Sequence, residues 1–314
     1  MRSSFWIKRE ILIVRERVAA TPDQAGELRR ITGGRRRGVK GLAGLRSVSV
    51  LSGKGGVGKS NVAVNLAMSL ALSGKKVVLL DADLGMANVD LLCGVTSKYN
   101  LAHLVRGERK IEEILVPLEN GVLLLPGGAG VQGLTELDDE DQSLLIDKLS
   151  VVERYADILL IDAGAGIHKN TMSFGTAADL TLLVTTPEPT SIRDVYGVLK
   201  TLAISTGSRI DVALVVNMAA SHSEGKEIAE RIQMAANQFL SLPVAYGGAV
   251  LTDEKVRKAV RMRTPFSLAF PDCQASKDIS AIAARVMMNG AEPQEGRGAK
   301  SFFLRLAKNL GLGG

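Results

Sequence analysis

Short apolar runs and longer amphipathic segments alternate along most of the chain. Runs of about four to eight apolar residues are typical of buried strands, and apolar residues repeated at helical spacing indicate helices. The runs predict strands at Ser47–Leu51, Lys76–Leu80, Gly121–Leu125, Asp157–Ile161, Leu180–Thr185, Ile210–Val216 and Pro243–Tyr246. The segments between them predict helices at Lys59–Leu72, Glu140–Arg154, Ser191–Ala203, Glu224–Leu240 and Lys277–Met288. This alternation predicts a doubly wound α/β fold, in which helices flank a mostly parallel sheet.

Several features favour a chain that works in the cytoplasm. The longest apolar runs, such as Val77–Leu80, are the length of strands and far too short to span a membrane. Ile11–Val14 is too short for the apolar part of a signal peptide and is flanked by charge. Cys93 and Cys273 form no CxxC pair, so we expect a reduced compartment.

The positive charge of the chain is concentrated at its N-terminus. Residues 1–46 carry 12 Lys and Arg against 4 Asp and Glu, although the whole chain has a net charge of only +6. A basic arm can bind nucleic acid, an anionic membrane or an acidic partner, and it is equally typical of a solvated linker. With 4% aromatic residues the chain offers few surfaces for stacking bases, so we do not expect nucleic acid as a partner.

The strongest motif is a phosphate-binding loop. Residues 53–60 match G-x-x-x-x-G-K-[ST], after a predicted strand and at the start of a predicted helix. Glycines allow backbone N–H groups to turn towards phosphates, and the helix N-terminus adds the positive end of its dipole. We assign nucleotide binding to Gly53, Lys54, Gly55, Gly56, Val57, Gly58, Lys59, Ser60 and Asn61. In this motif Lys59 neutralises the β- and γ-phosphates, and the Ser60 hydroxyl binds Mg²⁺.

Carboxylates follow two of the predicted strands. Asp81 and Asp83 come after one strand and Asp162 after another, at the edge where α/β sheets bind ligands. We predict that Asp162, as a Walker B carboxylate, and Asp81 hold the Mg²⁺ shell through water. The alternative for each aspartate is a helix N-cap.

The sequence partly indicates which nucleotide base the site binds. Guanine-specific relatives of such loops end a strand with an acidic motif, whereas this chain has Asn217-Met218-Ala219-Ala220. Asn217 can bond an adenine amino group, or it can simply start a turn. We therefore expect ATP and Mg²⁺ as the cofactors.

Residues 47–290 resemble the MinD/ParA group of dimerising ATPases. The resemblance rests on the second lysine of the loop, Lys54, on Asp81-Ala82-Asp83-Leu84-Gly85 and on Asp162-Ala163-Gly164-Ala165-Gly166. It implies that Lys54 reaches the phosphates of a partner subunit in an ATP-bound homodimer, as an arginine finger does. It also implies that Asp83 orients the attacking water, so Lys54, Lys59, Asp83 and Asp162 are the expected catalytic residues.

The N-terminal arm resembles the FlhG family, also called FleN or YlxH, within that group. Residues 23–29 read Asp-Gln-Ala-Gly-Glu-Leu-Arg, similar to an Asp-Gln-Ala-x-x-Leu-Arg element, and residues 21–31 are expected to form a short helix. The resemblance implies that this helix activates the GTPase FlhF, with Gln24 at the GTPase centre. The expected partner-binding residues are Asp23, Gln24, Ala25, Leu28 and Arg29. Residues 1–20 have no assigned function, and residues 32–46 are a basic linker.

The C-terminal segment has the pattern of an interfacial membrane helix. After a polar linker at residues 291–299, apolar residues of 300–314 fall on one side of a helix and basic residues on the other. The expected membrane-binding residues are Phe302, Phe303, Leu306 and Leu310, with Arg305 and Lys308 towards anionic lipid. The alternative is a helix that packs on the surface of the protein itself.

Together these features predict a slow, dimer-dependent ATPase at the inner face of the cell membrane. The resemblance implies that it regulates the number or placement of flagella through FlhF, with the switch proteins FliM and FliN as further possible partners. Three alternatives stay open: a MinD-type regulator of the division site, a ParA-type ATPase for DNA segregation, and a scaffold that binds ATP without hydrolysing it.

Overall fold

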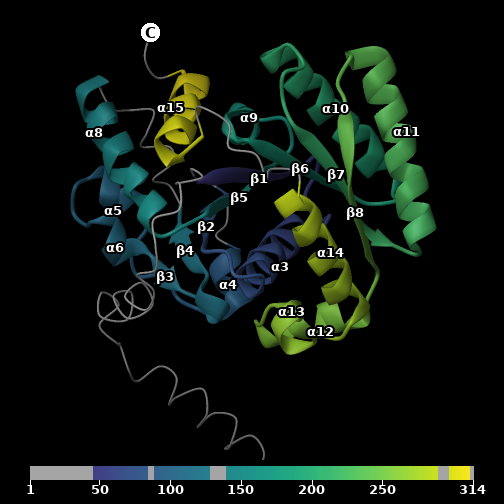
Figure 1. Cartoon of the computed structure of the whole chain (residues 1–314), viewed down its shortest axis with the longest axis horizontal. Coiled ribbons are helices and arrows are strands. Elements are labelled where there is room, and N and C mark those ends of the chain that lie inside the picture. Colours follow the sequence, from purple (N-terminus) through teal and green to yellow (C-terminus); the bar gives the residue numbers. More distant parts are fainter. Residues whose placement is uncertain (1–44, 84–87, 128–138, 289–296, 312–314) are drawn as a thin grey trace, which may run out of the picture. The chain divides into compact units, whose positions relative to one another are not determined.

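The computed structural model describes residues 45–83, 88–127, 139–288 and 297–311. They form an eight-stranded sheet with the order β3-β4-β2-β5-β1-β6-β7-β8 (Figure 1). All neighbouring strands are parallel apart from β3 and β4, which are antiparallel. The strands are β1 (Arg46–Ser52), β2 (Val77–Ala82), β3 (Val116–Pro117), β4 (Leu123–Pro126), β5 (Ile158–Ala165), β6 (Leu180–Thr185), β7 (Val212–Ala219) and β8 (Val244–Leu251). The predicted doubly wound, mostly parallel sheet is confirmed.

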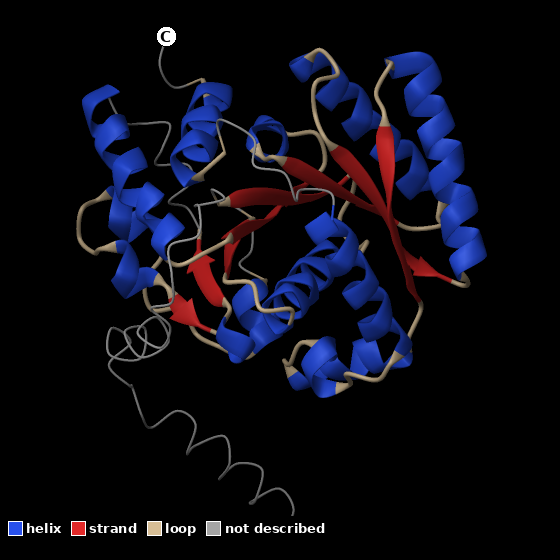
Figure 2. Cartoon of the chain, in the orientation of Figure 1, coloured by secondary structure: helices blue, strands red, loops and turns tan. Residues whose placement is uncertain are grey.

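Helices cover both faces of this sheet, as Figure 2 shows. Helices α3 and α14 lie on one face, and α9, α10 and α11 lie on the other. The helices are α3 (Lys59–Leu72), α4 (Val89–Cys93), α5 (Leu101–Val105), α6 (Ile111–Ile114), α8 (Asp139–Ser150), α9 (Lys169–Ala177), α10 (Pro189–Thr206), α11 (His222–Leu240), α12 (Glu254–Met262), α13 (Phe266–Ala269), α14 (Gln274–Met288) and α15 (Ala299–Leu310). Two 3-10 turns, η1 (Glu119–Gly121) and η3 (Val151–Arg154), complete the described part of the chain.

Burial of the central elements explains their sequences. Every residue of β1 is buried, because β5 and β6 flank it and helices cover its two faces. Helix α3 is buried from Val62 to Leu70 and shows little amphipathicity, as expected for a helix enclosed on all sides. Its N-terminus lies at the carboxyl end of β1, so the core holds the phosphate-binding loop between two buried elements.

Some elements differ from the sequence prediction. Helix α9 was not predicted, since its Lys-Asn-Thr-Met-Ser-Phe-Gly-Thr-Ala sequence holds many weak helix formers. Strand β8 continues beyond Tyr246, where we expected it to end, through Gly247 and Gly248. A Cβ on Gly248 would lie 2.8 Å from a side-chain carbon of Ile282, so the glycine allows α14 to pass close to the strand. Elements α4, α5, α6, β3, α12 and α13 were not predicted either.

The C-terminal segment forms the predicted amphipathic helix, α15, and the helix packs on the protein's own surface. Its apolar side is buried against α8 and α9, and these buried residues include Phe302, Phe303, Leu306 and Leu310. Lys169 at the start of α9 donates a hydrogen bond of 2.7 Å from Nζ to the carbonyl of Leu310. Arg305 pairs with Asp179 at 2.9 Å, while Lys308 is exposed. In this structure, therefore, the four predicted membrane-binding apolar side chains face protein.

Two further findings concern the ends of the chain. No helix in the described ranges combines the length and apolar character needed to cross a bilayer. The predicted FlhF-activating helix at residues 21–31, residues 1–20 and nearly all of the basic linker at 32–46 lie outside the described residues. Strand β1 begins at Arg46, the residue with which that linker was expected to end.

Candidate nucleotide site

The phosphate-binding loop has the backbone shape that its glycines predict. It runs from the end of β1 to Lys59, the first residue of α3, and Gly58 has a φ of +82°. A Cβ at Gly58 would also lie 2.4 Å from Nδ2 of Asn217, so both backbone and space require glycine there. Gly55 and Gly56 are exposed, and a Cβ on either would meet no atom within 4 Å. The middle of the loop therefore faces open space.

Lys59 and Asp162 form a buried ion pair beneath this loop. The Lys59 Nζ lies 2.6 Å from Oδ1 of Asp162, and the two side chains are 7% and 0% exposed. The same amine lies 3.4 Å from the hydroxyl oxygen of Ser60. Burial raises the pKa of the Asp162 carboxyl, and the charge of Lys59 opposes that shift. The structure thus brings together three residues that the sequence predicts at the phosphates and the metal.

Asp81 stands beside Asp162 because β2 and β5 are neighbours. Their parallel register pairs the two residues directly. Burial, and then the negative charge of Asp162, raise the pKa of Asp81 to about 6. Hydrogen bonds of 3.3 Å from the backbone N–H groups of Val89 and Asp83 partly offset this rise. Asp81 therefore anchors the start of α4 as well as facing the site.

Asp83 follows the end of β2 and is half-buried. Its backbone is tied to Asp81 by the 3.3 Å hydrogen bond. Among the residues expected at the carboxyl edge, Leu84 and Gly85 lie outside the described ranges. Asp83 is thus at the predicted edge of the sheet, and its role with water stays a prediction.

The donor atoms present suit Mg²⁺ bound together with a nucleotide. Oδ2 of Asp162 is buried and has no hydrogen-bond partner among the described residues, which leaves it free for a metal-bound water. In the same part of the chain, no group of three or more His, Cys, Asp and Glu side chains could hold a metal ion. Mg²⁺ usually takes one or two carboxylates, waters and phosphates rather than a protein cage. Ser60, Asp162 and Asp81 fit that pattern.

Asn217 closes the loop from the side of β7. It is buried, and its Nδ2 donates a hydrogen bond of 2.8 Å to the carbonyl of Val57. Its side-chain oxygen is the atom that would accept a bond from an adenine amino group. The neighbouring Met218 has a φ of +58°, and its Cε would lie 3.4 Å from a Cβ at Gly58. The sequence did not indicate that Met218 borders the loop.

Lys54 does not point towards Lys59 and Asp162. Its Nζ lies 2.5 Å from Oε2 of Glu188 and 3.0 Å from the hydroxyl oxygen of Thr190, at the start of α10. Sequence reasoning missed both acceptors. Glu188 and Thr190 lie 134 and 136 positions from Lys54, so the local sequence pattern does not indicate these contacts.

The glycine loop after Asp162 connects the site to α9. The backbone N–H of Gly166 donates a hydrogen bond of 2.8 Å to the carbonyl of Ser52, at the end of β1. Helix α9 begins three residues later, at Lys169, and carries α15 on its surface. This loop therefore leads directly into the helix on which α15 packs.

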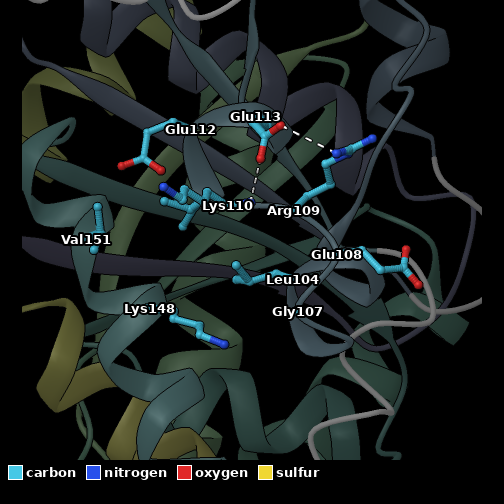
Figure 3. Close-up of a pocket in the computed structure, with 10 residues that line it drawn as sticks. Leu104, Gly107, Glu108, Arg109, Lys110, Glu112, Glu113, Lys148 and Val151 are labelled. Atoms are coloured by element: carbon cyan, nitrogen blue, oxygen red, sulfur yellow. Dashed lines mark hydrogen bonds and ion pairs between the residues drawn. The ribbon is translucent and has the colours of Figure 1, made fainter.

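A separate cavity of about 530 Å³ lies away from these residues (Figure 3). Leu104, Ile111 and Val151 supply its apolar lining, and residues 107–110, 112, 113 and 148 complete its wall. Arg109 and Glu113 form an ion pair of 3.7 Å on its rim. It contains none of the residues predicted to bind nucleotide, Mg²⁺, partner or membrane.

Comparisons with known proteins agree with this geometry. A family model described as an AAA domain matches residues 45–211. The chain is 39% identical to the antiactivator FleN of Pseudomonas aeruginosa, over 86% of this chain and 96% of FleN. It is 37% identical to the flagellum site-determining protein YlxH of Helicobacter pylori, over 84% of this chain and 90% of YlxH.

A solved structure shares the fold. It is the septum site-determining protein MinD of Pyrococcus horikoshii in complex with Mg-ADP, which superposes with a TM-score of 0.63 at 24% identity, over 80% of this chain and 99% of MinD. The chain is therefore a P-loop ATPase of the MinD/ParA type, and it belongs to the FlhG family that includes FleN and YlxH.

Proposed function

We propose that this ATPase forms a homodimer around ATP, associates with the cytoplasmic face of the membrane, and regulates flagellar number or placement by acting on the GTPase FlhF. The observation that carries the proposal is the buried Lys59–Asp162 pair below a loop whose two middle glycines, Gly55 and Gly56, face open space. The names of the FleN and YlxH relatives support the flagellar role. Action on FlhF, FliM or FliN rests on the resemblance of residues 21–31.

Different residues of the site have different roles in ATP hydrolysis. The triphosphate would exchange for Asp162 as the partner of Lys59, which frees that carboxylate for the metal shell with Ser60 and Asp81. Mg²⁺, when bound, neutralises charge on the phosphate oxygens. Asp83 orients the attacking water, and Lys54 of each subunit meets the charge that develops on the phosphates of the other. Because Lys54 lies on an open loop, a partner subunit can reach it.

Membrane association requires that α15 leave its place on α8 and α9. The side chains that would enter lipid are buried in this structure, with Phe302 at 0% exposure and Leu310 at 5%. Burial of each large apolar side chain contributes about 1.5–3 kcal/mol, in lipid as in protein. A released α15 therefore binds lipid about as strongly as it bound α8 and α9. Two tails on one dimer raise the effective concentration of the second, which makes membrane binding depend on ATP.

The decisive experiment compares the oligomeric state of three full-length proteins with ATP and Mg²⁺, by light scattering. We expect wild type to cycle between monomer and dimer, Asp83→Ala to bind ATP and stay dimeric, and Lys54→Ala to bind ATP and stay monomeric. A monomeric Asp83→Ala protein saturated with ATP would contradict the role of Asp83. Stimulation of GTP hydrolysis by FlhF with a peptide of residues 21–31 tests the partner, and a scrambled peptide is its control.

One observation favours the ParA-type alternative. Helix α12 exposes Arg257, Lys258 and Arg261, and no ion pair joins these side chains to any other residue in the described ranges. Such a face can contact a phosphate backbone. ATP-dependent binding to nonspecific DNA that weakens steeply with salt, and that Lys258→Gln reduces, would favour DNA segregation over the flagellar role.

A further inference from the structure

Lys54 rests on its own subunit at the entrance to α10. Glu188 is the N-cap of this 18-residue helix, Pro189 is its first residue and Thr190 is its second. The Lys54 amine contacts the carboxylate of Glu188 at 2.5 Å and the hydroxyl of Thr190 at 3.0 Å. Lysine has three ammonium hydrogens, so these two contacts occupy most of its donors.

Glu188 offsets an otherwise unfavourable position for this amine. The N-terminus of a helix carries the positive end of its dipole, which repels a cation. Thr190 offers a neutral acceptor, whereas the Glu188 carboxylate, in contact with the amine, opposes the repulsion. The start of the loop is packed closely on α10, because a Cβ on Gly53 would lie 2.4 Å from the backbone of Asp194. We therefore expect Lys54 to change its partner by rotation of its side chain.

The contact is weak enough to be exchanged. The side chains of Lys54 and Glu188 are 30% and 65% exposed, and ion pairs this exposed contribute little to stability. A triphosphate presents several negative charges and many acceptor oxygens, so it attracts the amine more strongly than one solvated carboxylate. The resting contact therefore biases the position of Lys54 without trapping it.

We propose that Glu188, assisted by Thr190, is a positioning residue that holds Lys54 in a resting place on its own subunit until the nucleotide of the partner subunit draws the amine away. This inference rests on the proposed function, since it assumes that Lys54 acts across a dimer. Releasing Lys54 from Glu188 costs free energy, and this cost is subtracted from the free energy of dimerisation. Glu188 therefore weakens the dimer of the nucleotide-bound protein.

The first test reads the resting contact directly, in the nucleotide-free full-length protein. A short pulse of acetic anhydride labels lysine amines, and mass spectrometry compares Lys54 with the exposed Lys75 as an internal reference. We expect Glu188→Gln to raise relative labelling of Lys54 by about two- to five-fold, the range of an exposed ion pair, and Thr190→Val to raise it less. Unchanged labelling in Glu188→Gln would overturn the inference.

The second test reads the consequence for pairing. Sedimentation with Mg²⁺ and an ATP analogue that resists hydrolysis gives the dimer dissociation constant. We expect Glu188→Gln to lower this constant by about two- to five-fold, and Lys54→Ala to abolish the dimer in either background. A Glu188→Gln dissociation constant equal to that of wild type overturns the inference. A higher dissociation constant also overturns it, because Glu188 would then stabilise the dimer by contacting the partner. A wild-type protein that never pairs, or a Lys54→Ala protein that pairs normally, would instead contradict the proposed dimer, while the labelling result still reports on the resting contact.

Discussion

The Nζ of Lys59 lies 2.6 Å from Oδ1 of Asp162, and both side chains are buried. Removing one partner of a buried pair leaves an uncompensated charge, which typically costs about 3–5 kcal/mol. We therefore expect Lys59→Met to lower the free energy of unfolding by about that amount at pH 7.5, and by less in acid, where Asp162 is protonated. Urea unfolding of the nucleotide-free protein measures the change.

The double variant Lys59→Met with Asp162→Asn is the matched control for that variant. It removes both charges of the pair, so no buried charge is left without a partner, and we expect a smaller loss of about 1–2 kcal/mol. Equal losses in the single and the double variant would show that the buried charge of Asp162 is not the source of the effect.

The carboxyl of Asp81 makes stability depend on pH. Its pKa is about 6 in the folded protein against an ordinary value of 3.8, so the folded state holds the proton more tightly. The resulting stabilisation is fully present below pH 3.8 and is lost as the pH rises through about 6. A shift of about two units corresponds to about 3 kcal/mol.

Asp81→Asn removes this dependence. In EDTA and without nucleotide, we expect the variant to be more stable than wild type by about 1–3 kcal/mol at pH 8 and to differ little at pH 4. Urea unfolding at both pH values measures the two differences. A constant difference between pH 4 and pH 8 would contradict the assignment.

Gly53 and Gly55 belong to the same motif and have different surroundings. A Cβ on Gly53 would overlap the backbone of Asp194 and Val195, at 2.4 and 2.6 Å, whereas a Cβ on Gly55 meets nothing within 4 Å. We expect Gly53→Ala to lower the free energy of unfolding by about 1–3 kcal/mol, the usual cost of overpacking, and Gly55→Ala to change it by less than about 0.5 kcal/mol. Thermal unfolding without nucleotide compares them. Similar losses would mean that α10 does not pack on the loop as described.

Helix α15 offers two neighbouring side chains with opposite surroundings. Phe302 is fully buried, whereas Leu304 is 49% exposed. Phe302→Ala should remove about 3–5 kcal/mol from the docking of α15, and hydrogen exchange of residues 299–310 should then speed up by at least about a hundredfold. Leu304→Ala should leave the exchange nearly unchanged. If both variants exchange as wild type does, α15 is not held by its apolar side.

Much of the fold was predictable because local patterns agree with it. Lys59–Leu72 and Leu180–Thr185 were predicted with the bounds that the structure shows, since an apolar helix after a glycine loop and a run of buried strand residues leave little choice. Helix α9 was missed, because its own sequence favours a helix only weakly and its packing partners, α15, α10 and β5, lie elsewhere along the chain.

The candidate site was likewise predictable from the sequence only in part. The loop and Ser60 were predicted from motif spacing, Asp81 and Asp162 from their places after predicted strands, and the role of Asp83 from the resemblance to the MinD/ParA group. The contact of Lys54 with Glu188 joins residues 134 positions apart, and no local pattern indicates it. The register that pairs Asp81 with Asp162, and so raises the pKa of Asp81, depends on which strands become neighbours.

The sequence by itself determined the class of fold, the phosphate-binding loop, and an amphipathic C-terminal helix with one apolar side. Periodicity and motif spacing are local properties, so they can be identified without knowing how the rest of the chain folds. Only the tertiary structure decided that this apolar side meets α8 and α9, and that Lys54 rests on Glu188. Such contacts depend on the crossing of distant elements, where burial and charge are settled by three-dimensional neighbours rather than by order along the chain.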